Sequence, residues 1–233
     1  MIVMGIDGCR AGWVAVSQDL TTDLVSWQLL NQIDGLASLL SVPSVVALDI
    51  PIGLPERGAR ACDVAARRLL GQPRGSSVFP APIRPVLDAG SYAEACKIRF
   101  AVEGKKMSRQ AWGIVPKIRE VDGFLRGNPV FQPTVHEAHP EVSFYCLAGG
   151  RPMEHSKRTL AGRLERRSLL ANVFGNVVDE ALLQRRSLQS QEDDVLDAFA
   201  LLWSARRIAA SVCMSLLASP TADPCGLPMQ ILA

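Results

Sequence analysis

Short apolar runs separated by turn residues open the chain. Residues 2–7, 13–17 and 24–30 are rich in β-branched and aromatic side chains, and a glycine-flanked turn at 8–12 joins the first two runs. Runs of this length and composition are typical of β-strands, and short turns between them connect antiparallel neighbours. We therefore expect an antiparallel meander of three strands.

The segments that follow predict a mixed sheet. Residues 33–40 carry apolar side chains at helical spacing and lead into an apolar run at 45–49. A helical crossover sets the next strand parallel to its partner. A further strand is expected at 134–138. The pattern therefore indicates an α/β fold with a mixed five-stranded sheet and flanking helices.

Glycine and proline are frequent between residues 51 and 85. Loops this long and irregular are usually functional. We interpret residues 57–129 as a helical, loop-rich insertion over the sheet edge, with helices at 62–70, 92–102 and 110–125. A proline within the last of these predicts a kink. The whole chain, 1–233, is then a single domain.

The C-terminal half is expected to be mainly helical. Residues 140–147 and the strongly basic segment 159–173 each predict a helix. Residues 193–217 are apolar nearly all round, which is typical of a helix buried on every side. The tail from residue 219 is rich in proline and is expected to be a surface strap.

The overall charge does not by itself indicate a nucleic-acid partner. Lys and Arg total 25 against 23 Asp and Glu, a net charge of +2, which is too balanced for affinity through charge alone. A local basic group would either face a polyanion or form a solvated helical face. Its members are Lys97, Arg99, Lys105, Lys106, Arg109, Lys117 and Arg119.

The cysteines and the hydropathy pattern indicate a cytoplasmic protein. The six cysteines are scattered with no C-x-x-C pair, which favours reduced thiols over disulfides or a zinc site. No apolar run approaches the roughly 20 residues that span a bilayer, and no basic segment followed by an apolar one opens the chain. We expect no membrane partner.

Carboxylates stand where apolar runs end. Asp7 and Asp49 close two predicted strands, and neighbouring strands about 4.8 Å apart would bring them together. Asp194 and Asp197 lie three residues apart on one face of the last predicted helix. An alternative is that these acids form turns or cap the helix, with Glu192 or Asp193 as the cap.

Several carboxylates from distant segments suit a two-metal site. Two divalent ions about 3.5–4 Å apart activate water and stabilise the leaving oxygen in phosphodiester hydrolysis. Magnesium and manganese prefer oxygen ligands. We therefore expect Mg²⁺ or Mn²⁺ to bind the catalytic residues Asp7, Asp49, Asp194 and Asp197.

Further candidates flank the fifth predicted strand and the loops. Glu137, His139 and Glu141 would shuttle protons or position water, or one of the glutamates caps the helix that begins at residue 140. Hydroxyl and guanidinium groups in the loops would bind a phosphate group of the substrate. The alternative for residues 74–82 is that their many small side chains only form a tight structural loop. The predicted substrate-binding residues are Arg10, Arg74, Ser76, Ser77, Arg84 and Lys157.

Five blocks carry a family resemblance: GIDGCRAGW at 5–13, DIPIGLP at 49–55, RGSSVFPAP at 74–82, EAHPEVSF at 137–144 and DDVLDA at 193–198. They resemble an uncharacterised family of predicted nucleases with a ribonuclease H-like fold and, more loosely, the Holliday-junction resolvases, whose final helix carries two aspartates three apart.

The resemblance implies Asp7 and Asp49 as metal ligands, with Asp194 and Asp197 closing the site. One departure is Ala138, where the family tends to have a β-branched or aromatic residue. The smaller side chain leaves less packing beneath His139.

The predicted function is therefore a metal-dependent nuclease that hydrolyses DNA or RNA by a two-metal-ion mechanism. Two alternatives stay open. One is a small-molecule phosphotransferase of the actin or sugar-kinase type, which shares a sheet that begins with a strand ending in Gly-x-Asp. The other is a catalytically silent nucleic-acid-binding module. A homodimer would suit a symmetric four-way junction, although no interface pattern indicates one.

Overall fold

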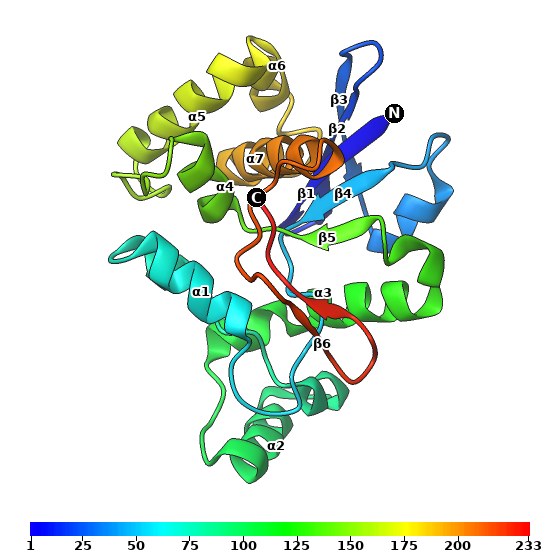
Figure 1. Cartoon of the computed structure of the whole chain (residues 1–233), viewed down its shortest axis with the longest axis vertical. Coiled ribbons are helices and arrows are strands. Elements are labelled where there is room, and N and C mark those ends of the chain that lie inside the picture. Colours follow the sequence, from blue (N-terminus) through cyan, green and yellow to red (C-terminus); the bar gives the residue numbers. More distant parts are fainter.

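The computed structural model describes residues 1–233 and contains a mixed five-stranded sheet in the order β3-β2-β1-β4-β5. Strand β2 is antiparallel to both of its neighbours, β1 and β3, whereas β4 and β5 run parallel to β1 (Figure 1). The predicted α/β class and mixed sheet are confirmed. The strands are β1 (Ile2–Cys9), β2 (Gly12–Asp19), β3 (Val25–Leu30), β4 (Val45–Leu48) and β5 (Val135–Glu137).

The central strand β1 separates two hydrophobic cores. Successive side chains of a strand point to opposite faces of the sheet. Met4 and Ile6 therefore belong to a core of 29 buried residues on one face, and Val3 belongs to a core of 21 buried residues on the other. The two faces are covered by different parts of the chain.

Helix α7 (Glu192–Ala209) lies directly against β1 on the second face. Gly5 makes this close approach possible, because a Cβ at this position would lie 2.0 Å from the backbone nitrogen of Leu202 and 2.3 Å from the carbonyl oxygen of Ala198. A glycine inside a strand often marks such a close approach. The contact sets the position of the first turns of α7 over the end of β1.

Three more helices lie beside α7 (Figure 1). They are α4 (Pro140–Leu147), α5 (Leu160–Phe174) and α6 (Val177–Leu183). The predicted helices at 140–147 and 159–173 are confirmed to within a residue, whereas α6 was not predicted. Helix α7 ends eight residues before the predicted boundary at 217, because Ser211 adopts a positive φ of 58° and the chain then turns back.

The inserted segment covers the first face. Its helices are α1 (Ala61–Leu70), α2 (Tyr92–Glu103) and α3 (Arg109–Gly127), joined by the short 3₁₀ turns η2 (Arg74–Ser77) and η3 (Arg84–Asp88). Val115 and Ile118 of α3 pack in the same core as Met4 and Ile6. The insertion therefore shares a core with the sheet, and α3 continues through Pro116.

Two sequence-based predictions were wrong at the local level. The first concerns residues 33–40, which form the short 3₁₀ helix η1 (Ile33–Ser38). Another short 3₁₀ helix, η4 (Pro129–Phe131), precedes β5. The tail forms the hairpin β6 (Thr221–Ala222) and β7 (Pro228–Met229), and its last three residues are buried. It is not a surface strap, because Leu232 forms bridges with Ala138 and Ser215. None of the helices combines the length and apolar character needed to cross a bilayer.

Candidate functional site

The parallel pairing of β1 with β4 ends just before Asp7 and Asp49 and so brings these two residues together, although β1 itself continues past the predicted end at Asp7 to Cys9. Ile6 pairs with Leu48 in the parallel register, and the backbone N–H of Asp49 donates to the carbonyl oxygen of Ile6 at 3.1 Å. The side chains alternate, so Asp7 follows Val3 to the face covered by α7. The two carboxyl groups lie within hydrogen-bond reach of each other.

Asp197 joins this pair from α7. Burial raises the pKa of Asp7 well above its usual value, and the neighbouring charges of Asp197 and Asp49 raise it further. Burial also raises the pKa of Asp49 and that of Asp197, the latter to about 6. Like charges held together away from water favour protonation or a bound cation. The predicted convergence of distant carboxylates is therefore present for Asp7, Asp49 and Asp197.

Lys157 supplies positive charge to the same cluster. Its Nζ lies 2.6 Å from Oδ2 of Asp197 and 3.9 Å from Oδ2 of Asp193. The charge of Asp197 raises the pKa of Lys157 despite burial. The second oxygen of Asp197, Oδ1, is buried and has no hydrogen-bond partner. The ammonium group therefore satisfies only half of this carboxylate.

The start of α4 contributes His139 and Glu141. His139 is the N-cap residue, and its Nδ1 accepts the backbone N–H of Glu141 at 3.2 Å. In the neutral ring the proton is then on Nε2. Oε1 of Glu141 pairs with the buried Arg166, while Oε2 is buried without a partner. The cap is thus His139 itself, and Glu141 is the glutamate that faces the carboxylate cluster.

Glu137 belongs to a different cluster. It pairs with Leu48 across the sheet and shares the side of Val135, the face opposite to Asp7. Both of its oxygens bind Arg60, at 2.6 and 2.7 Å, and Oε2 also accepts the backbone N–H of Ile52. Burial raises the pKa of Glu137 to about 7. Because its oxygens are already occupied, we assign it a structural role in place of the predicted catalytic one.

Asp194 lies at the edge of the carboxylate cluster. Its Oδ2 accepts the backbone N–H of Gln191 at 2.8 Å, which completes a capping box at the start of α7. Gln191, and neither Glu192 nor Asp193, is the N-cap. Asp194 makes the smallest of the charge contributions to the raised pKa of Asp7. One of its oxygens is therefore committed to the helix end, as the capping alternative predicted.

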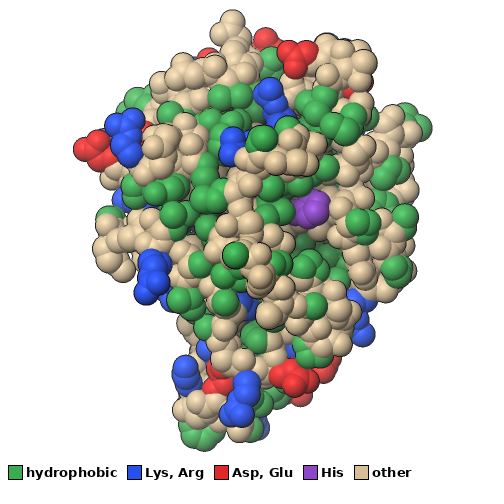
Figure 2. All heavy atoms as spheres, in the orientation of Figure 1, with side chains coloured by type: hydrophobic (Ala, Val, Ile, Leu, Met, Phe, Trp, Pro, Cys, Tyr) green, Lys and Arg blue, Asp and Glu red, His purple; other side chains and the backbone are tan.

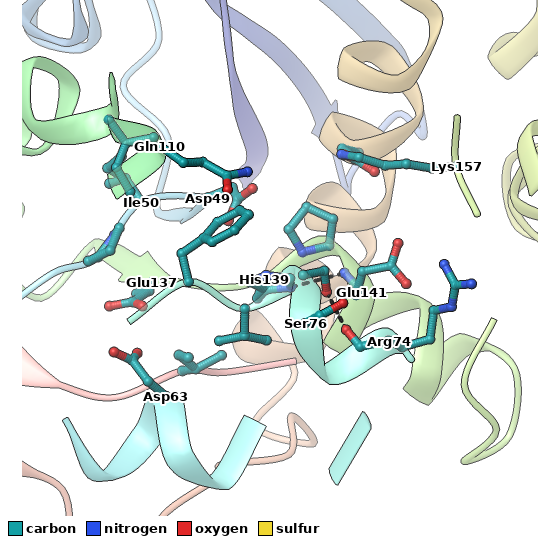
Figure 3. A pocket seen from close by; sticks show the side chains of 18 of the residues that line it. Asp49, Ile50, Asp63, Arg74, Ser76, Gln110, Glu137, His139, Glu141 and Lys157 are labelled. Atoms are coloured by element: carbon teal, nitrogen blue, oxygen red, sulfur yellow. Dashed lines mark hydrogen bonds and ion pairs between the residues drawn. The ribbon is translucent and has the colours of Figure 1, made fainter. Parts of the chain in front are cut away.

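A cavity of about 550 Å³ opens over these side chains (Figure 3). Asp49, His139, Glu141 and Lys157 line it, and Figure 3 shows Lys157 reaching in from the segment before α5. Asp197 also contributes to the lining. Asp7 is not among the lining residues. The cavity therefore has an acidic inner wall with one ammonium group beside it.

The turn η2 forms another wall of the cavity. Arg74, Ser76 and Ser77, which were predicted to bind substrate, line it. The Ser76 hydroxyl donates to the carbonyl oxygen of Pro73 at 2.6 Å, and that of Ser77 to the carbonyl oxygen of Arg74 at 2.7 Å. Both hydroxyl protons therefore stabilise the turn, and only the oxygen lone pairs are free to interact with a ligand.

Two predicted substrate contacts lie elsewhere. Arg10 is exposed in the turn between β1 and β2 and does not line the cavity. Arg84 is mostly buried and forms ion pairs with Asp122, at 2.7 Å, and with Asp223. It ties the C-terminal segment to α3 and is therefore structural. These two assignments are corrected because neither side chain reaches the cavity.

Sequence reasoning missed several lining residues. Among them, Phe79 and Gln110 face the cavity from the loop after η2 and the first turn of α3. Each belongs to a segment whose position depends on tertiary packing. Phe79 lies within RGSSVFPAP at 74–82, one of the blocks that carry the family resemblance, and this was the only sequence feature that pointed to it.

On the face shown in Figure 2, the Lys and Arg side chains are scattered and form no continuous band. At the site itself, no group of three or more His, Cys, Asp or Glu side chains is arranged as a ready-made metal centre. Instead, the ammonium group of Lys157 forms an ion pair with Asp197 inside the carboxylate cluster.

The fold and the site together define an α/β protein with an acidic cavity at the carboxyl ends of its central parallel strands. The family described as "Protein of unknown function (DUF429)" matches residues 5–222, and the chain belongs to this family. No curated protein and no solved structure matches the chain.

Proposed function

We propose that this protein is a Mg²⁺- or Mn²⁺-dependent hydrolase of phosphodiester bonds in cytoplasmic DNA or RNA, built on a ribonuclease H-like sheet. The observation that carries the proposal is the meeting of Asp7, Asp49 and Asp197, from three distant segments, beside a cavity that Asp49 and Asp197 line. The mixed five-stranded sheet agrees with the fold that the family resemblance implies. Phosphodiester chemistry accounts for both the acids and the neighbouring cations.

The donor chemistry of the residues suits a hard divalent cation, although the side chains are not arranged as a ready-made metal centre. Oδ1 of Asp197 and Oε2 of Glu141 are buried without hydrogen-bond partners. An unsatisfied buried acceptor costs about 1–3 kcal/mol, and more when it is charged. Carboxylate oxygens are the ligands that Mg²⁺ and Mn²⁺ prefer. Asp7, Asp49 and Asp197 would hold the ion, with Glu141 beside it.

Lys157 competes with this ion. Its ammonium group already binds Asp197 at 2.6 Å, so cation binding requires that contact to weaken. A released ammonium group would be available to a phosphate oxygen at the same cavity. Lys157 therefore neutralises the carboxylates in one state and binds substrate in the other.

The remaining groups position the substrate and move protons. When bound, the divalent ion supplies charge neutralisation and lowers the pKa of water. Arg74 presents its guanidinium group to the cavity, where a phosphate is the natural partner. His139 is held through Nδ1, which leaves Nε2 to exchange a proton with water or with the leaving oxygen. The chain thus provides both binding and proton transfer.

The proposal is tested with labelled branched DNA, RNA/DNA hybrid and single strands incubated with Mn²⁺ or Mg²⁺. We expect cleavage of at least one substrate by the wild type, loss of cleavage in Asp7→Asn, and full cleavage in the exposed control Asp34→Asn. Cleavage that persists in Asp7→Asn contradicts the assignment. Salt-sensitive binding without cleavage under any condition would identify a binding module instead.

A further inference from the structure

The cavity is also lined by apolar side chains. They include Phe79 and Ile114, together with the nearly buried Ile50 and Val78. Phe79 is 38% exposed although it is a large apolar side chain. Water-exposed aromatic rings inside a pocket commonly serve as binding surfaces for flat ligands. This ring has no role in the hydrolytic chemistry proposed above.

The loop that carries Phe79 is held firmly. Val78 is buried in a small core with Cys62 and Val142. Two residues after Phe79, the backbone N–H of Ala81 donates to Oδ2 of Asp63 at 3.0 Å. The exposure of the ring is therefore set by fixed neighbours on both sides and is not a consequence of a loose loop.

Cationic groups border the same cavity. Arg74 lines it, and its Nε is buried without a hydrogen-bond partner. Lys157 and Arg158 line it from the segment before α5. The exposed Gln110 adds an amide that both donates and accepts hydrogen bonds. A ligand with a phosphate, a flat ring and polar ring edges matches all of these groups.

The size of the cavity restricts the ligand further. Its volume of about 550 Å³ lies within the range of roughly 300–1,000 Å³ that holds small molecules. Proteins that bind the backbone of a duplex use an array of basic contacts along the phosphates. The scattered basic side chains in Figure 2 do not form such an array on that face.

Resting on the proposed function, we propose that the cavity binds a single nucleotide unit, with its base stacked on Phe79 and its phosphate against Arg74 and Lys157. The substrates are then the ends of single strands or small phosphodiesters of mononucleotide size, and not the interior of a duplex. Stacking of bases on aromatic side chains is tolerant of sequence, so we expect little discrimination among bases.

The test is calorimetric binding of AMP, TMP and inorganic phosphate to the full-length protein in the presence of Mg²⁺. We expect both nucleotides to bind more tightly than phosphate. Phe79→Ala should weaken nucleotide binding about tenfold and leave phosphate binding unchanged. Phe79→Tyr should retain the wild-type affinities. Phe100→Ala, at an exposed phenylalanine outside the cavity, is the matched control and should change nothing.

Three results would overturn this inference. The first is equal affinity of the wild type for AMP and phosphate, and the second is an equal loss of affinity for AMP and for phosphate in Phe79→Ala. The third is cleavage of a closed circular duplex as fast as cleavage of a linear single strand. Strand cleavage by the wild type tests the proposed function separately. Cleavage without any preference for AMP over phosphate overturns the nucleotide cavity alone. Phe79-dependent AMP binding without cleavage of any phosphodiester supports the cavity and contradicts the hydrolase.

Discussion

Two clusters of buried charge border the same cavity, and they differ in how their oxygens are satisfied. In the cluster of Arg60, Asp63 and Glu137, every carboxylate oxygen accepts at least one hydrogen bond. In the other cluster, Asp197 and Glu141 each keep one buried oxygen without a partner. The first cluster is complete without a ligand, whereas the second is not.

The difference separates structural acids from candidate functional ones. Burial of a charge is costly unless it is paired and hydrogen-bonded. Arg60 pairs with both Glu137 and Asp63 and so meets this requirement. Arg60 also donates hydrogen bonds to the carbonyl oxygens of Ile52 and Gly53, and these bonds hold the loop after β4. Lys157 pairs with only one of the two carboxylate oxygens of Asp197, so the buried charge of Asp197 is only partly compensated. Buried acids that remain unsatisfied are better candidates for ligand binding than buried acids as such.

The largest effect is expected from removing the cation of the complete cluster. Arg60→Met leaves Asp63 and Glu137 buried without their partner and should lower the free energy of unfolding by about 3–5 kcal/mol. Urea unfolding followed by circular dichroism measures this. Arg57→Met, at an exposed neighbouring arginine, is the control. A loss below about 1 kcal/mol in Arg60→Met would show that the complete cluster is not structural.

The next effect concerns activity. Asp49→Asn should reduce phosphodiester cleavage at least about 100-fold, because it removes a carboxylate that would hold the divalent ion. The same variant should keep or raise the melting temperature, because it removes a buried negative charge. Cleavage rates and thermal unfolding are measured on one preparation. A large drop in melting temperature with unchanged cleavage would make Asp49 structural, like Glu137.

A smaller effect is expected from pH. The folded pKa of Asp197 is raised to about 6 from the ordinary 3.8. Between these values the folded chain binds more protons than the unfolded chain, so the contribution of Asp197 lowers stability as pH rises from about 4 to about 6. Asp197→Asn removes this contribution, on the order of 2 kcal/mol. Denaturation curves across this pH range compare the two proteins, and parallel pH profiles would refute the shift.

The smallest effect is expected from removing the competing ammonium group. Lys157→Met frees Asp197 for a cation and should raise the affinity for Mn²⁺ about tenfold, or about 1.4 kcal/mol. Isothermal titration calorimetry measures this without any substrate. Lys105→Met, at an exposed lysine outside the cavity, should leave the affinity unchanged. Weaker binding in Lys157→Met would mean that the lysine supports the cation site.

Periodicity along the chain predicted most of the secondary structure. The strands and the helices α1, α2, α3, α4 and α5 follow from alternating or helically spaced apolar residues and were expected close to their observed bounds. Helix α6 was missed because seven residues are too few to establish a period. The end of α7 was missed because apolar residues at 210–217 pack as an extended segment, where Leu216 pairs with Ile231.

The site was predictable only in part. The acids at strand ends, Asp7 and Asp49, were identified because charge is rarely placed at the end of an apolar run without a reason. Glu137 has the same sequence context but lies on the other face. One residue of register decides which face a strand side chain takes, and the register of β5 follows from its pairing with β4. Arg84 was misassigned because its partner Asp223 lies 139 residues away in the chain.

Local sequence was sufficient to define a mixed α/β sheet with carboxylates at its strand ends, because strand period, helix period and turn residues act over a few neighbours. The packing of α7 on Gly5 decided which of those acids meet, and the loops after η2 and before α5 decided that Phe79 and Lys157 face them. The contact of Gly5 with Leu202 joins segments far apart in the chain, and that of Lys157 with Asp197 joins residues 40 positions apart. The energies of these contacts depend on burial and charge pairing that exist only in the folded chain.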